Sequence, residues 1–227
     1  MLAKLVRPPQ LVVFDLDGTL VDSSGDIAAA VQAALERVAP GVPALSLEQV
    51  RGFIGNGARA LIERSLEAAG VRRPPEEVLQ AFLECYRERL LDTTRLYPGA
   101  AAALAGLGGT PLAVLTNKPG ALSRRLLEGL GLGARFERVV GGDDLPQRKP
   151  DPAGLLWILA ELEVPAERAV MVGDSAVDVR TGRAARVFTV GFSGGYDPEG
   201  LSACPPDLLL DDLAALPGRL GQPAPGA

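Results

Sequence analysis

One stretch decides the fold of this chain: Leu11-Val12-Val13-Phe14-Asp15-Leu16-Asp17-Gly18-Thr19-Leu20. Its first four residues are apolar, which is typical of a short strand buried on both faces of a parallel sheet. Alternate side chains of a strand share a face, so we expect Asp15 and Asp17 to converge just past the strand's end. Two adjacent carboxylates favour a bound cation or different protonation states, although an acidic turn that ends the strand is the simpler interpretation. The tight Gly-Thr turn that follows favours a catalytic or ligand-binding role for the two aspartates over a plain turn.

The composition excludes several classes of function. At 227 residues with 47% hydrophobic content, the chain suits one large or two small domains with an ample core. A net charge of −5 and only 4% aromatic residues disfavour nucleic acid and anionic membranes as partners. Cys85 and Cys204 are far apart and form no CxxC pair, which disfavours structural zinc and a disulfide scaffold. Residues 1–10 hold no apolar run long enough for a signal peptide or a membrane span, so a cytoplasmic protein is expected.

Histidine does not occur in the sequence. Mechanisms that need a histidine base, phosphoacceptor or metal ligand are therefore excluded. Acid–base chemistry has to come from carboxylates, lysine, tyrosine or cysteine, and this strengthens the case for the two aspartates of the opening stretch.

Between about residues 22 and 93, apolar residues recur at helical spacing and no strand pattern is present. Prolines and a glycine over 40–43 end the first expected helix. Ser46 with Gln49 three residues later predicts a capping box at the next one. A glycine-rich turn follows over 51–57, and Pro74-Pro75 begins the last helix. We therefore predict a helical domain over 22–95, inserted after the first strand.

From residue 97 the pattern changes to short apolar strands that alternate with helices. Strands are expected over 112–115, 136–140, 169–172, 187–190 and 208–210. This alternation predicts an α/β fold, a doubly wound (Rossmann-like) parallel sheet, formed by residues 1–21 and 96–227. The segments near 20–24 and 93–98 are the expected linkers to the helical domain.

In such sheets, ligands bind beyond the carboxyl ends of the strands. Thr116, Asn117 and Asp174 follow expected strands directly, and Lys149 lies in a loop before a helix that crosses back to the sheet. Each has a simpler explanation: a helix cap for Thr116-Asn117, a solvated charge for Lys149, and a turn for Asp174. These residues are informative only as a set.

As a set, and in this order, they resemble the haloacid-dehalogenase-like phosphotransferase superfamily. Four motifs carry the resemblance: Asp15-Leu16-Asp17-Gly18-Thr19, Thr116-Asn117, Lys149-Pro150, and Gly173-Asp174-Ser175 followed by Asp178. The resemblance covers nearly the whole chain, including a helical cap between the first and second motifs.

The resemblance implies phosphoryl transfer, in which the protein mainly positions groups and stabilises charge. Asp15 would attack phosphorus and form an aspartyl-phosphate. Asp17 would protonate the leaving alkoxide and then deprotonate the hydrolytic water. Asp15, the backbone carbonyl of Asp17, and Asp174 would bind Mg²⁺, a hard cation that prefers oxygen ligands.

The same resemblance assigns supporting roles. Phosphate would be held by Gly18, Thr116, Asn117 and Lys149, the last of which would also neutralise charge on the covalent intermediate. Asp178, one helical turn from Asp174, would hold Lys149 in place or support the metal ligands, with Ser175 beside it.

Differences between members of the superfamily reduce the number of reaction types that fit this sequence. Asp17 supplies an acid that dehalogenating members lack, which favours phosphate transfer over carbon–halogen cleavage. Residues 22–95 contain no lysine for the Schiff base of phosphonate-cleaving relatives, and no histidine of the kind that hexose-phosphate mutases carry in the cap. Hydrolysis of a phosphate monoester is therefore the expected reaction.

Within the superfamily, the sequence is most similar to bacterial phosphoglycolate phosphatases, through residues 15–23, 53–57, 116–119 and 141–144 ahead of Lys149-Pro150. The turn Gly55-Asn56-Gly57 is a candidate for binding a small carboxylate through free backbone amides, or is a plain inter-helix turn. Arg51 and Arg59 flank it and are either charge donors for that carboxylate or surface arginines. Arg186 stands where relatives usually have glycine, and Thr181 where they usually have alanine.

The leading hypothesis is a Mg²⁺-dependent phosphatase that acts on a small phosphorylated metabolite, with phosphoglycolate as the expected substrate. A pyrophosphatase or a sugar- or nucleotide-phosphate phosphatase with the same core is the alternative. A more remote alternative is a non-catalytic module that binds phosphate or a partner. The sequence does not distinguish a monomer from a homodimer, because apolar helix faces serve core and interface alike.

Overall fold

A computed structural model describes residues 8–221 of the chain. The predictions for residues 1–7, and those for the end of the chain beyond residue 221, lie outside the described residues. Among the described residues, no helix combines the length and the apolar character needed to cross a bilayer.

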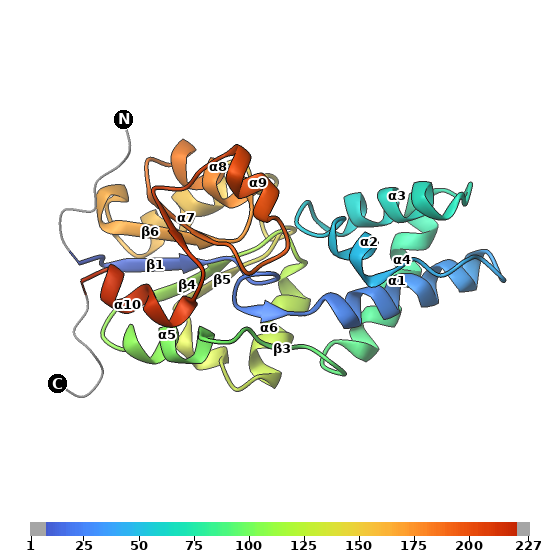
Figure 1. Ribbon diagram of the computed structural model, residues 1–227, viewed down its shortest axis with the longest axis horizontal. Helices are drawn as coiled ribbons and strands as arrows, with labels where there is room; N and C mark the ends of the chain where they lie inside the picture. The colour runs from blue at the N-terminus through green and yellow to red at the C-terminus, as the bar shows by residue number, and fades with distance from the viewer. Residues whose placement is uncertain (1–7, 222–227) are drawn as a thin grey trace.

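A six-stranded parallel sheet forms the centre of the larger lobe, in the order β5-β4-β1-β6-β7-β8 (Figure 1). Its strands are β1 (Leu11–Phe14), β4 (Leu112–Leu115), β5 (Arg138–Val140), β6 (Ala169–Gly173), β7 (Phe188–Phe192) and β8 (Leu208–Leu210). In β1, Val13 pairs with Ala113 of β4 on one side and with Met171 of β6 on the other. The opening stretch therefore supplies a central strand, and the predicted doubly wound sheet is confirmed.

Two hydrophobic clusters cover the two faces of the sheet, as the period of two in a strand requires. Val12 and Phe14 of β1 belong to one cluster, and Leu11 and Val13 belong to the other. The first face is covered by α5 (Ala100–Gly106), α6 (Gly120–Gly129) and α10 (Leu216–Arg219), and the second by α7 (Ala153–Glu161) and α8 (Ala176–Ala184). The short α9 (Pro198–Ala203) packs beside α8.

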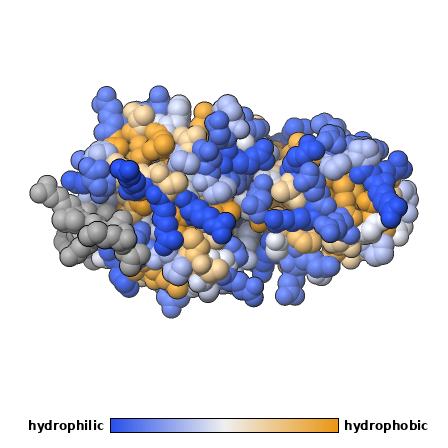
Figure 2. All heavy atoms as spheres, turned by 90° about the horizontal axis from the view of Figure 1, so that it is seen from above, coloured by the Kyte–Doolittle hydropathy of each residue, from blue (hydrophilic) through white to orange (hydrophobic). Residues whose placement is uncertain are grey.

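Four helices form a second, smaller lobe (Figures 1 and 2). They are α1 (Ser24–Val38), α2 (Leu47–Arg51), α3 (Ala58–Ala69) and α4 (Pro75–Arg89). The predicted capping box opens α2, where Ser46 Oγ accepts a hydrogen bond from Gln49 N at 3.1 Å. We refer to these four helices and their connections as the cap.

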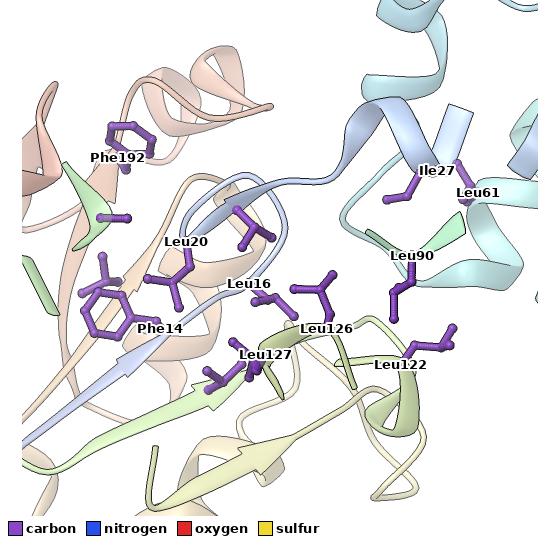
Figure 3. Packing of buried hydrophobic residues seen from close by; sticks show 14 of the residues in the cluster. Phe14, Leu16, Leu20, Ile27, Leu61, Leu90, Leu122, Leu126, Leu127 and Phe192 are labelled. Atoms are coloured by element: carbon purple, nitrogen blue, oxygen red, sulfur yellow. The ribbon is translucent and has the colours of Figure 1, made fainter. Parts of the chain in front are cut away.

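The cap joins the sheet through two chain segments that pair with each other. β2 (Val21–Asp22) and β3 (Arg95–Leu96) run antiparallel, with Val21 opposite Leu96. The sequence indicates connections at these places but not their pairing, because two residues are too short to show a strand's alternation. The apolar cluster also crosses the junction: Leu90 of the cap lies near Leu122 of α6 (Figure 3).

Strand boundaries differ from expectation in three places. β6 covers Ala169–Gly173 rather than 169–172, one residue more. β5 begins at Arg138 rather than at 136, because Phe136 packs into the hydrophobic cluster before the strand starts. β7 covers Phe188–Phe192 rather than 187–190, because Arg186 has a φ of 60° and ends the turn that follows α8.

The side chain of Asp26 in α1 binds the segment that leads back to β3. Its Oδ1 accepts hydrogen bonds from Thr93 N and Oγ1 at 2.8 and 2.6 Å, and its Oδ2 accepts from Thr94 N and Oγ1 at 2.9 and 2.6 Å. Asp26 is 1% exposed. One buried carboxylate thus holds the start of α1 against the segment that returns to the sheet.

We expect Asp26→Ala to lower the free energy of unfolding by about 2–4 kcal/mol, because it leaves the two buried donors of Thr94 and the two partly buried donors of Thr93 without an acceptor. Urea unfolding followed by circular dichroism measures this change. The neighbouring Asp92→Ala is the matched control, because Asp92 is exposed and its ion pair with Arg89 is 4.0 Å long. Equal stability of the two variants would contradict this role for Asp26.

The backbone conformation at Arg186, one of the two departures from the family pattern, explains why a glycine would be expected at this position. Its φ of 60° lies in the left-handed region, where glycine carries no steric cost. We expect Arg186→Gly to be about 0.5–1 kcal/mol more stable than Arg186→Ala, which removes the same charge and keeps the strain. Thermal unfolding of both variants measures this, and a more stable alanine variant would contradict it. Thr181, the other departure, is buried and donates its hydroxyl to Val177 O at 2.8 Å.

Candidate active site

Three strands of the sheet bring polar residues to one edge. Asp15 follows β1, Thr116 and Asn117 follow β4, and Asp174 follows β6. The backbone continues the sheet's pairing past the strand ends: Asp15 N donates to Val172 O at 2.8 Å, and Thr116 N donates to Val140 O at 3.0 Å. The carboxyl ends of neighbouring parallel strands meet at one edge, so residues far apart in the sequence converge as predicted.

Lys149 joins two carboxylates at this edge. Its Nζ lies 2.8 Å from Asp15 Oδ1 and 2.7 Å from Asp178 Oδ1, and its side chain is 2% exposed. Asp178 Oδ2 accepts hydrogen bonds from Ser175 Oγ and N at 2.6 and 3.2 Å, in a capping box that opens α8. The predicted neighbours Lys149, Asp178 and Ser175 are therefore one connected group.

Asp174 is held without a cationic partner among the described residues. Its Oδ1 accepts from Thr19 Oγ1 at 3.0 Å, and its Oδ2 accepts from Tyr196 N at 2.6 Å. Gly18 approaches it closely: a Cβ there would lie 2.4 Å from Asp174 Oδ2, and its φ is 90°. The glycine of the opening stretch is required both by this approach and by its backbone conformation.

The carboxylates outnumber the cations in this cluster. One oxygen from each of Asp15, Asp174 and Asp178 lies within 4.8 Å of the others. Burial raises the pKa of Asp15 to about 7, with Lys149 opposing the rise and Asp178 adding to it. Burial, and the charges of Asp15 and Asp178, also hold the pKa of Asp174 well above its ordinary value. The ammonium of Lys149 pairs with only two of these three buried carboxylates, Asp15 and Asp178, so the all-oxygen donor set fits a divalent cation.

Asp17 points to a second cation, Lys118. Lys118 Nζ lies 2.9 and 3.1 Å from the two oxygens of Asp17, and Ser23 Oγ donates to Asp17 Oδ1 at 2.5 Å. Lys118 Nζ also donates to Tyr86 Oη of α4. Burial acts to lower the pKa of Lys118, but Asp17 and Tyr86 raise it above its ordinary value, so the ammonium is retained.

A small cavity lies above these residues, between the sheet edge and the cap. It has a volume of about 50 Å³, and polar residues line its floor: Asp15, Asp17, Thr116, Asn117 and Lys118. The cap supplies an apolar roof that includes Ile54, Leu61, Phe82 and Tyr86. Gly55 and Gly57 line it too, and Asn117 Nδ2 donates to Gly55 O at 2.9 Å. The side chain of Asn117 therefore bridges sheet and cap.

Three of the candidate residues in the cap lie elsewhere. Arg51 and Asn56 line a separate, wider cavity of about 880 Å³ that faces α9. Arg51 Nη2 donates to Ser24 Oγ at 3.1 Å, and its guanidinium lies over the ring of Tyr196. Arg59 pairs with Glu63 at 2.9 Å and Glu76 at 2.6 Å on the surface. The structure therefore does not bring either arginine to the cavity above Asp15.

Two residues at the edge are absent from the set predicted by sequence, Lys118 and Tyr196. A signal for Lys118 was present: the chain has twenty arginines and three lysines, and two of those lysines, Lys118 and Lys149, are buried here. The ammonium of lysine is a compact point charge and the guanidinium of arginine is a larger planar group, so the two residues are not interchangeable at such a site. No sequence pattern marks Tyr196, whose backbone N–H contacts Asp174 and whose hydroxyl donates to Asp22 Oδ1 at 3.0 Å.

Comparison with known proteins places this arrangement in a family. Residues 12–192 match the haloacid dehalogenase-like hydrolase family. The chain belongs to the haloacid dehalogenase-like hydrolases. This hydrolase is 40% identical to a phosphoglycolate phosphatase of Pseudomonas putida over 96% of this chain and 82% of the relative. It is 42% identical to a phosphoglycolate phosphatase of Rhodospirillum rubrum over 96% of this chain and 93% of the relative.

Solved structures agree with the hydrolase fold. The crystal structure of a predicted phosphoglycolate phosphatase from Haemophilus somnus 129PT superposes with a TM-score of 0.88 at 31% identity. It covers 96% of this chain and 100% of its own. The predicted family resemblance and the predicted fold are thereby confirmed.

Proposed function

We propose that this hydrolase converts 2-phosphoglycolate to glycolate and phosphate, with Asp15 as the nucleophile and Asp17 as the acid and base. The observation that carries the proposal is the small cavity in which Asp15, paired with Lys149, and Asp17 lie together beneath the cap. Relatives at 40–42% identity are called phosphoglycolate phosphatases, which supports this substrate. A water-sized group needs about 10–15 Å³ of such space, so the cavity's volume also supports a leaving group of few atoms.

In the first step, Asp15 attacks phosphorus, and the bond from phosphorus to the ester oxygen breaks. The ester oxygen leaves as the hydroxyl of glycolate with a proton from Asp17. Lys149 would offset the charge on Asp15 and on the transferred group, and Thr116 and the backbone at Gly18 and Asn117 would hold the other phosphate oxygens.

In the second step, Asp17 takes a proton from water, which attacks the phosphorus of the aspartyl-phosphate and releases Asp15 and phosphate. The apolar roof supplied by the cap keeps other water from the intermediate. Asp178 and Ser175 fix the position of Lys149 throughout, through the contacts described above.

Mg²⁺ is the proposed cofactor. Asp15, Asp174 and the backbone carbonyl of Asp17 would hold it, while both oxygens of Asp178 are already occupied by Lys149 and Ser175. When bound, the cation would neutralise charge on the phosphate and favour the ionised form of Asp15, whose pKa burial otherwise raises to about 7.

A panel of phosphate esters tests this function. We expect kcat/KM at saturating Mg²⁺ to be highest for 2-phosphoglycolate, compared with pyrophosphate, a hexose phosphate and a nucleoside monophosphate. EDTA should abolish phosphate release. A preference for another ester would contradict the proposed substrate, and no release from any ester would contradict the enzymatic function.

A further inference from the structure

The substrate proposed above carries a carboxylate, and the cavity offers one cation for it. Among the described residues that line this cavity, Lys118 is the only basic one. Arg51 faces the wider cavity, and Arg59 is engaged by two glutamates on the surface. A carboxylate confined beneath the cap would therefore meet the ammonium of Lys118 before any arginine of the cap.

Lys118 is bound by neighbouring side chains and lies away from bulk water. Its side chain is 4% exposed, and its Nζ contacts both oxygens of Asp17. The ring of Tyr86 lies 4.4 Å from Nζ, and its hydroxyl accepts a hydrogen bond from it. Tyr86 in turn stacks on Phe82 with ring centroids 5.4 Å apart. The cap thus presents an aromatic support to a cation that the sheet edge carries.

The connectivity of the substrate fits this position. In 2-phosphoglycolate a single methylene carbon separates the ester oxygen from the carboxylate. The group that protonates the ester oxygen and the group that binds the carboxylate must then be immediate neighbours. Asp17 and Lys118 are such neighbours, with 2.9 Å between Oδ1 and Nζ. The ammonium has three N–H donors: when one is shared between the two oxygens of Asp17 and a second donates to Tyr86, the third is left for a substrate carboxylate.

We propose that Lys118 is the specificity-determining residue of this enzyme: its ammonium binds the carboxylate of the leaving group, and Tyr86 of the cap positions it. The inference rests on the proposed phosphoglycolate phosphatase function. It explains why a lysine that takes no part in attack on phosphorus is buried beside the proton carrier. It also makes recognition depend on the cap, because Tyr86 reaches Lys118 only where α4 covers the sheet edge.

The test compares 2-phosphoglycolate with ethyl phosphate, which lacks the carboxylate and has a leaving group of similar length. The ratio of their kcat/KM values measures carboxylate recognition. We expect Lys118→Met to lower this ratio by about 10²- to 10³-fold, mainly through a higher KM for 2-phosphoglycolate. Tyr86→Phe keeps the ring and should lower the ratio by about 3- to 10-fold. Tyr86→Phe therefore tests the proposal even if the Lys118→Met protein does not fold. Arg37→Met, at an exposed cap ion pair, is the charge-matched control and should keep the ratio.

Three outcomes would overturn the inference. If Lys118→Met slows both esters equally, Lys118 only positions Asp17. If Arg51→Met or Arg59→Met lowers the ratio instead, the carboxylate binds at the cap turn. If Tyr86→Phe leaves the ratio unchanged when Lys118→Met does not fold, the cap takes no part. Failure of the proposed function is distinguishable, because the unmodified enzyme would then show no preference for 2-phosphoglycolate over ethyl phosphate.

Discussion

Asp15→Asn is expected to hydrolyse 2-phosphoglycolate about 10⁴- to 10⁶-fold more slowly than the unmodified enzyme, the range seen when a nucleophile is removed. The amide keeps the shape of the side chain but cannot form the acyl phosphate. Phosphate release at saturating Mg²⁺ measures the loss.

Two comparisons make this result specific. Asp211→Asn makes the same change at an exposed residue and should keep full activity. The thermal unfolding temperature of Asp15→Asn should show that the variant is folded. A folded Asp15→Asn enzyme with normal turnover would contradict the role of Asp15.

The second large effect is expected at Lys149. Lys149→Met should lower the free energy of unfolding by about 3–5 kcal/mol, because it leaves the buried carboxylates of Asp15 and Asp178 without their shared partner. It should also reduce kcat about 10²- to 10³-fold, because the charge of the transferred group loses a fixed cation. Urea unfolding and steady-state kinetics measure the two effects separately.

The double variant Lys149→Met/Asp178→Asn separates stability from catalysis. Removing one of the two stranded carboxylates should restore part of the lost stability while activity remains low. If Lys149→Met unfolds at the same urea concentration as the unmodified protein, the ion pairs at 2.7 and 2.8 Å do not stabilise the fold, and this account of the cluster is wrong.

The sheet could be predicted because each central strand is a short apolar run that is followed directly by a polar residue. Asp15 directly follows β1, Thr116 follows β4, and Asp174 follows β6. Parallel strands place those ends together, so the sequence predicts their convergence without any knowledge of side-chain geometry. The pairing of β2 with β3 could not be predicted, because it depends on how the cap returns to the sheet.

The supporting residues were less predictable because long side chains reach beyond the position of their own backbone. Lys118 belongs to the Thr116-Asn117 loop, but its contact with Tyr86 joins residues 32 positions apart. The surface position of Arg59 could have been predicted, because Glu63 lies four residues later on the same helix and forms an ion pair with it. Helical spacing therefore identifies a surface arginine more readily than a buried lysine.

The central claim is that the phosphoryl group passes through Asp15, and direct capture of the intermediate tests it. Enzyme mixed with excess 2-phosphoglycolate and Mg²⁺ is quenched in acid within the first turnovers, digested and analysed by mass spectrometry. The account predicts the added mass of one phosphoryl group on the peptide that contains Asp15, and its absence in Asp15→Asn. A phosphoryl group on another residue, or none while phosphate is being released, would contradict it.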